Sequence, residues 1–79
     1  MKTNGHNTIK VGMVVVYRGS WGMGARTESK IIGMELCEGI HEKYGEEVDE
    51  VSVNDWERVV LDLADGHWAY GYQLEEIIG

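Results

Sequence analysis

The sequence predicts a small all-β domain. Its apolar residues fall in short runs rich in valine and isoleucine, glycine-marked turns separate these runs, and no stretch of useful length has the period of an amphipathic helix. With 79 residues the chain forms one domain. Because so few strands remove their exposed edges only by bending and closing, we expect a small barrel of four to five antiparallel strands.

The first half of the chain supplies two of these strands. Residues 1–8 are polar and are expected to form a flexible N-terminal lead-in, so that the barrel domain covers residues 9–79. Residues 9–17 (IKVGMVVVY) are apolar on both faces, as in a central strand, and Gly12 indicates a bend or bulge within it. After a glycine-rich loop, residues 28–39 alternate as a half-buried strand does.

The second half predicts a hairpin. Residues 58–63 (RVVLDL) and 67–74 (HWAYGYQL) read as two strands on either side of Asp65-Gly66, a dipeptide typical of tight hairpin turns. Trp68, Tyr70, Tyr72 and Leu74 would then share one side of the second strand. The last residues, EEIIG, are expected to form a short tail with one helical turn.

Charge is concentrated in residues 35–57, which hold nine of the fourteen acidic residues and one of the seven lysines and arginines. This segment has no clean period and is expected to be a long acidic loop or an irregular hairpin. It would repel phosphate backbones, and the chain has no basic stripe, so direct binding to duplex nucleic acid is not expected.

Catalysis and metal binding find little support in the sequence. Cys37 is the only cysteine, which excludes an intrachain disulfide and favours a reducing, cytoplasmic location. Cys37 and His41 lie on either side of Gly39, so a rigid nucleophile–base pair completed by Asp55 or Glu57 is not supported. We therefore expect no enzyme activity, no metal site and no cofactor, and no apolar stretch is long enough to span a membrane.

The order of three segments resembles that of SH3-like small barrels: VGMVVVYRG comes first, then KIIGMEL, then RVVLDLADGHWAYGYQLEEI. The closing VVLDLADGHWAYGYQLEEI and the stretch YRGSWG also resemble small proteins encoded by tailed bacteriophages. The first resemblance implies a fold, and that the loop after the first strand lies near later strand ends as one wall of a groove. The acidic segment between the second and third long strands departs from the compact barrel.

The candidate ligand site lies where this loop would meet the final hairpin. Flat rings accept planar ligands, and arginine grips phosphate or carboxylate. The expected ligand-binding residues are Arg18, Ser20, Trp21, Arg26, His67, Trp68, Tyr70 and Tyr72. The same aromatic residues would equally serve as a lid on a small core, and the arginines as partners of the acidic loop.

A second candidate site is the acidic segment itself. Glu46, Glu47, Asp49 and Glu50 would steer the protein toward a basic surface, and Trp56 would anchor it there. Trp56 would equally plug the bottom of the barrel.

Two functions follow from these sites. The first is a binding protein that holds a small anionic or nucleotide-like ligand and, given the phage resemblance, sequesters a host immune signal in the host cytoplasm. The alternative is an acidic inhibitor that docks on the basic groove of a host nucleic-acid-binding or defence protein; an adaptor barrel without a ligand is a third interpretation. A homo-oligomer is a candidate for the first function, because a pocket between two copies would enclose a ligand that so short a chain cannot.

Overall fold

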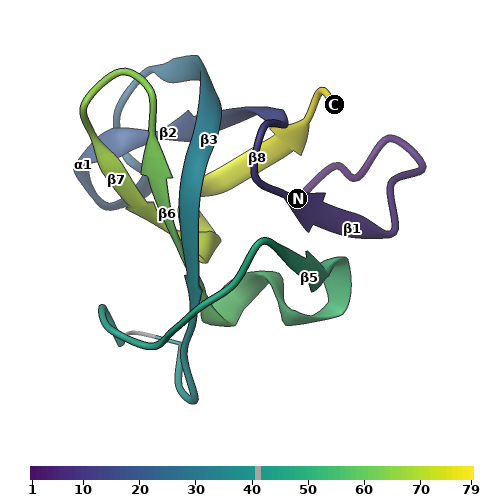
Figure 1. The fold of residues 1–79 in the computed structure, drawn as a ribbon. Helices are drawn as coiled ribbons and strands as arrows, with labels where there is room; N and C mark the ends of the chain where they lie inside the picture. The colour runs from purple at the N-terminus through teal and green to yellow at the C-terminus, as the bar shows by residue number, and fades with distance from the viewer. Residues whose placement is uncertain (41) are drawn as a thin grey trace.

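The computed structural model describes residues 1–40 and 42–79. Strands predominate, with one short left-handed turn and two 3-10 helices between them (Figure 1). In chain order the elements are β1 (Thr8–Lys10), β2 (Val14–Arg18), α1 (Gly19–Gly22), β3 (Arg26–Leu36), β4 (Glu46–Glu47), β5 (Glu50–Ser52), η1 (Val53–Arg58), β6 (Val59–Leu63), β7 (Trp68–Tyr70), η2 (Gly71–Gln73) and β8 (Leu74–Ile77).

The strands form two antiparallel sheets. The larger has the order β7-β6-β3-β2-β8, with β4 added beside β3, and the smaller pairs β1 with β5. The predicted all-β class is confirmed. The sheets of the described residues do not close into a barrel.

The long strand β3 belongs to both halves of the larger sheet. Its first residues pair with β2 and its later residues with β6, and the register shifts between Ile31 and Gly33. Because this irregularity interrupts the simple alternation, Ile31 and Met34 are buried whereas Ile32 is 59% exposed. The alternation of residues 28–39 predicts Ile32 and Met34 on the same side of the strand, and this is wrong because of the register shift.

The expected first strand is two strands. Gly12 has a φ of +99°, a backbone conformation that favours glycine, and it lies in the turn between β1 and β2. The bend predicted at Gly12 is therefore sharp enough to send β1 to a different sheet, where it pairs with β5.

The final hairpin forms as predicted at Asp65-Gly66, where Gly66 has a φ of +89°. The second strand is shorter than expected, because β7 ends at Tyr70 and η2 follows. The expected helical turn at the C-terminus is instead the strand β8, which pairs with β2. Its backbone therefore gains hydrogen bonds in the sheet that a lone helical turn would lack.

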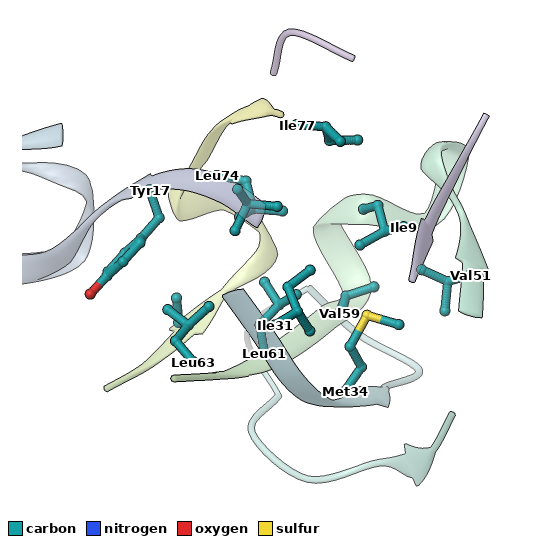
Figure 2. Packing of buried hydrophobic residues seen from close by; sticks show 12 residues of the cluster. Ile9, Tyr17, Ile31, Met34, Val51, Val59, Leu61, Leu63, Leu74 and Ile77 are labelled. Atoms are coloured by element: carbon teal, nitrogen blue, oxygen red, sulfur yellow. The ribbon is translucent and has the colours of Figure 1, made fainter. Parts of the chain in front are cut away.

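The core lies between the two sheets and η1. Figure 2 shows aliphatic side chains from nearly every strand gathered there, with the ring of Tyr17 at one edge and its oxygen directed away from them. The buried cluster comprises Ile9, Val15, Tyr17, Ile31, Met34, Val51, Val59, Leu61, Leu63, Ala69, Leu74 and Ile77.

The N-terminal residues, expected to be a flexible lead-in, make defined contacts. The backbone of Lys2 forms an isolated parallel β-bridge with that of Glu76. The side-chain amide of Asn4 donates to the Glu76 carboxylate at 2.8 Å and to the carbonyl of Ile77 at 2.7 Å. Met1 packs against the core. These contacts place the start of the chain along β8.

Within the acidic segment, residues 35–36, 46–47 and 50–52 are extended, as the irregular-hairpin interpretation expected, and residues 53–57 belong to the 3-10 helix η1, which it did not foresee. Ser52 caps η1 by accepting a hydrogen bond from the backbone N–H of Asn54 at 3.1 Å. No helix of the described residues has the length and apolar character needed to cross a membrane.

Gly71 is expected to be indispensable for packing η2 against η1. A Cβ at this position would lie 1.7 Å from the carbonyl oxygen of Trp56, a backbone atom that cannot rotate away. We expect Gly71→Ala to lower the free energy of unfolding by about 3 kcal/mol or more. Gly19→Ala is the matched control, because a Cβ there meets nothing within 4 Å, and it should change stability by less than about 0.5 kcal/mol in urea denaturation. Equal effects of the two substitutions would contradict this packing.

Candidate functional site

The turn α1 holds Trp21 in an unusual backbone conformation. Ser20 and Trp21 have φ values of +50° and +59°, and Gly22 follows with +92°, so three successive residues are left-handed. Two backbone hydrogen bonds close the turn, from Met23 to Ser20 and from Gly24 to Gly19, at 3.1 and 2.9 Å. A left-handed backbone costs a residue with a side chain on the order of 1 kcal/mol, and yet the Trp21 side chain remains 69% exposed.

Trp21 belongs to an aromatic cluster with residues of β7 and η2. Its ring is stacked on that of Tyr70, with centroids 5.8 Å apart and an interplanar angle of 27°. Trp68 meets the same Tyr70 edge-on at 5.0 Å, and Tyr72 stacks on it at 5.5 Å. Each such pair stabilises the fold modestly, by about 0.5–1.5 kcal/mol. Tyr70 is therefore the platform on which both tryptophans are positioned.

A groove of about 460 Å³ lies between α1 and the turn from β6 to β7. A smaller hollow of about 160 Å³ adjoins it and is lined by Trp21 and Tyr70. Three further residues line both the groove and this hollow, namely Ser20, Trp68 and Gln73. The larger groove is lined by Tyr17, Gly19, Ser20, Gly24, Ala25, Thr27, His67, Trp68 and Gln73. The loop after β2 and the final hairpin thus meet, and α1 lies beside β7 in Figure 1.

A single chain therefore contains a groove of the size that small ligands occupy, about 300–1,000 Å³. The groove is only partly enclosed by the single chain, so the homo-oligomer stays a prediction.

Tyr17, Asp65 and His67 form a polar cluster at one side of the groove. The Tyr17 hydroxyl donates to Asp65 Oδ2 at 2.6 Å, and His67 Nδ1 lies 3.3 Å from the same hydroxyl oxygen and 3.5 Å from Asp65 Oδ1. Burial, and then the hydrogen bond and negative charge of Asp65, raise the pKa of Tyr17 to about 12. The hydrogen bond from Tyr17 is the main cause that lowers the pKa of Asp65. At neutral pH the cluster therefore holds a carboxylate and a protonated phenol.

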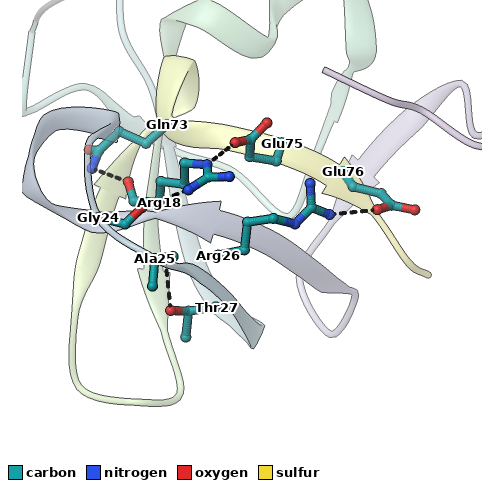
Figure 3. Close-up of polar contacts among 8 residues, drawn as sticks. All are labelled: Arg18, Gly24, Ala25, Arg26, Thr27, Gln73, Glu75 and Glu76. Atoms are coloured by element: carbon teal, nitrogen blue, oxygen red, sulfur yellow. Dashed lines mark hydrogen bonds and ion pairs between the residues drawn. The ribbon is translucent and has the colours of Figure 1, made fainter.

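The two arginines of the predicted site are paired elsewhere. Arg18 forms an ion pair with Glu75 and donates to the carbonyl of Gly24 at 2.9 Å, and Arg26 Nη2 lies 3.0 Å from Glu76 Oε1 (Figure 3). Neither arginine is among the residues that line the groove.

The register of β2 and β3 explains this placement. Tyr17 is opposite Thr27, and Arg18 is opposite Arg26. Alternate residues of a strand point to opposite faces of the sheet. Because Tyr17 and Thr27 face the groove, Arg18 and Arg26 lie on the opposite face, near β8. The geometry therefore argues against the expected anion-gripping role of Arg18 and Arg26, and their partners are Glu75 and Glu76 instead of the acidic loop.

Of the other predicted site residues, Ser20, Trp21, His67, Trp68 and Tyr70 line one of the two hollows, and Tyr72 supports them by stacking. The sequence prediction missed Tyr17, Thr27, Asp65 and Gln73. Gln73 accepts from the backbone N–H of Tyr70 at 2.8 Å and donates to the carbonyl of Arg18 at 2.9 Å, so it joins η2 to β2 beneath the groove. Gln73 takes the glutamine position of a capping box, but the N-cap residue is Tyr70 and not Ser or Thr, so the usual sequence signature is missing.

Lys43 approaches the aromatic cluster from the acidic segment. Its Nζ lies 4.5 Å from the centroid of the Trp68 ring and 5.5 Å from that of the neighbouring Tyr44. This is the geometry of a cation–π contact.

The alternative acidic site lacks its aromatic anchor. Glu46, Glu47, Asp49 and Glu50 are exposed, and Glu50 lies 3.7 Å from Lys10. Trp56 is half-buried in η1 and packs against the core, which agrees with the plug interpretation.

Of the reactive groups named in the sequence analysis, the structure describes Cys37, Asp55 and Glu57. Cys37 is buried, its thiol is 3.3 Å from the carbonyl of Glu42, and burial raises its pKa, which favours the unreactive thiol. His41 lies outside the described residues. Within residues 1–40 and 42–79 no three His, Cys, Asp or Glu side chains are grouped as metal ligands.

Comparison with known protein families, curated proteins and solved structures finds no match to this chain.

The burial of Tyr17 and its hydrogen bond to Asp65 should make the protein less stable at alkaline pH. Since the pKa of Tyr17 is raised from 10.0 to about 12 in the folded protein, its contribution is present below pH 10 and is lost as pH rises toward 12. We expect wild type to lose up to about 2–3 kcal/mol more than Tyr17→Phe over this range. Urea unfolding at pH 8, 10 and 11.5 measures the difference.

Tyr44→Phe is the control for this experiment, because Tyr44 is 76% exposed and should lose stability with pH as wild type does. At pH 8, Tyr17→Phe should be less stable by about 1–2 kcal/mol, since Asp65 loses a donor. A Tyr17→Phe protein that follows the wild-type pH profile would show that the phenol titrates normally.

Proposed function

We propose that the protein is a non-enzymatic binding protein whose groove holds the flat heterocyclic ring of a small, nucleotide-like ligand. One observation carries this proposal: Trp21, which is 69% exposed, and Trp68, which is 40% exposed, border adjoining hollows, and Trp21 is held there by a strained left-handed turn.

The conformational cost at Trp21 favours a binding role over a lid role. A lid would bury its indole and recover about 2 kcal/mol or more of hydrophobic free energy. Trp21 remains mostly exposed and gains only a partial stack on Tyr70. Strained residues that are not repaid by burial are typical of binding sites.

The dimensions of the groove suit a nucleobase with its sugar. Stacking on an aromatic side chain contributes about 1–3 kcal/mol per base and tolerates different bases. Because Arg18 and Arg26 are paired with glutamates, the ring of the ligand, and not its phosphate, would supply most of the affinity. This revises the sequence-based expectation of an arginine clamp.

The strand order supports, as a further part of this proposal, a relation to SH3-like barrels. β3 is shared by two halves of the sheet, the 3-10 turn η2 precedes the last strand, and β8 returns to pair with β2. In such an arrangement the loop after the first long strand borders a groove, which is where α1 lies. The phage resemblance of the closing segment adds sequestration of a host nucleotide signal as the biological role that we propose.

The acidic inhibitor is the weaker alternative. Its four acidic residues are exposed, but Trp56 packs against the core and offers no anchor at the surface. Replacing Glu46 and Glu47 with glutamine should therefore leave the binding of a nucleoside unchanged.

Ligand binding should depend on the two exposed indoles. We expect a nucleoside or nucleotide from a panel of bases, nucleosides, mononucleotides and cyclic dinucleotides to raise the melting temperature and to quench tryptophan fluorescence. Trp21→Ala and Trp68→Ala should each weaken that binding at least tenfold. Both side chains are exposed, so the variants should remain folded.

Met23→Ala is the matched control. Met23 follows the same turn and is 89% exposed, but it lines neither hollow. If no compound of the panel shifts either signal, or if Met23→Ala weakens binding as much as the tryptophan variants, the proposed function is wrong.

A further inference from the structure

We propose that the groove selects a planar ring that carries a positive charge, and that the ammonium group of Lys43 is an internal competitor for the ring of Trp68. This inference rests on the proposed function, because it names the charge of the ligand that the same groove would hold.

Lys43 shows how the protein itself uses the exposed indole. Its Nζ sits 4.5 Å from the centroid of the Trp68 ring, well inside the range of about 6 Å for cation–π attraction. Tyr44, the next residue, is also near the ammonium, at 5.5 Å. Trp68 therefore already binds one cation, supplied by the same chain.

The charges around the groove favour a cation. Asp65 is a carboxylate beside the groove residues Tyr17 and His67. Asp62 is directly cross-strand from Trp68, which puts both side chains on the same face of the β6–β7 hairpin. No lysine or arginine of the described residues lines either hollow. Asp62 and Asp65 do not line the hollows themselves, but Asp65 is hydrogen-bonded to Tyr17 and His67, which do, so the charge closest to these lining residues is negative and has no lysine or arginine of the lining to balance it.

The hydrogen-bonding groups of the groove point the same way. The only hydroxyl proton of Tyr17 is donated to Asp65, and that of Thr27 is directed to the carbonyl of Ala25 at 3.3 Å. Both oxygens keep lone pairs that accept hydrogen bonds. A ring that carries N–H donors and a positive charge satisfies these two acceptors, whereas an anion finds no free proton on the hydroxyls of Tyr17 and Thr27.

Lys43 lines neither hollow, so it would oppose a charged ring by repulsion across the shared indole of Trp68, and it can move away from that ring. It belongs to an exposed segment, and its contact with Trp68 is open to water, where cation–π attraction is weak. A charged ring in the groove would be partly shielded from water and would gain more from the same indole.

The experiment compares three nucleosides by fluorescence titration or calorimetry at pH 7. 1-Methyladenosine carries a positive charge on its ring, adenosine is neutral, and N6-methyladenosine is the neutral control for the methyl group. We expect 1-methyladenosine to bind about tenfold more tightly than either neutral nucleoside. Adenosine monophosphate should bind no more tightly than adenosine.

Substitutions then separate the role of Lys43 from that of overall charge. Lys43→Gln should tighten the binding of 1-methyladenosine about threefold or more, because the competitor is removed. Lys30→Gln makes the same change of charge on β3. Lys30 is exposed and points to the opposite face of the sheet from the groove residue Thr27, so this substitution should change binding less than twofold. Asp65→Asn should reduce the preference for the charged ring, and Asp49→Asn should not.

The outcomes distinguish this inference from the proposed function. If adenosine binds as tightly as 1-methyladenosine, or if adenosine monophosphate binds more tightly than adenosine, selection for a cation is wrong while the groove remains a binding site. If Lys43→Gln and Lys30→Gln have equal effects, Lys43 is not a competitor. If no nucleoside binds, the proposed function itself fails.

Discussion

The structure depends on one strand, β3, pairing on both of its halves with different partners. Its eleven residues bind β2 along the first half and β6 along the second, and the register shift near Gly33 lets the strand change direction between them. Without this irregularity the strand would present one continuous flat face and could not bring two sheet halves around a shared core. In so short a chain few other residues could supply that core, since small domains bury a limited share of their surface.

The same strand positions the groove. Thr27 at the start of β3 is opposite Tyr17, and their face of the sheet continues to the turn at Asp65 and to Trp68. The other face carries Arg18 and Arg26, which pair with β8 and attach the last strand to the sheet. One register thus places the groove on one face of the sheet and the two arginines on the other.

The sequence predicts the class of the fold, the hairpin at Asp65-Gly66 and the meeting of two aromatic segments. The first two features depend on local signals, namely β-branched runs and a turn dipeptide, whereas the meeting of the two segments is what the resemblance to SH3-like barrels implies. The face of Ile32, the pairing of β1 with β5 and the partners of the arginines could not be predicted, because each depends on a bulge or on a contact between residues far apart in the chain. Tyr17 was read as part of a buried strand, and only its partner Asp65, 48 residues later, gives it a polar role.

The left-handed turn has a consequence for how quickly and how firmly a guest would be held. Two backbone hydrogen bonds and the stack on Tyr70 fix the indole of Trp21 before any guest arrives. A preorganised wall loses little conformational entropy upon association, so the entropic penalty that weakens many flexible loops is largely avoided. Differences in residence time among guests would then reflect how well each fits a rigid surface.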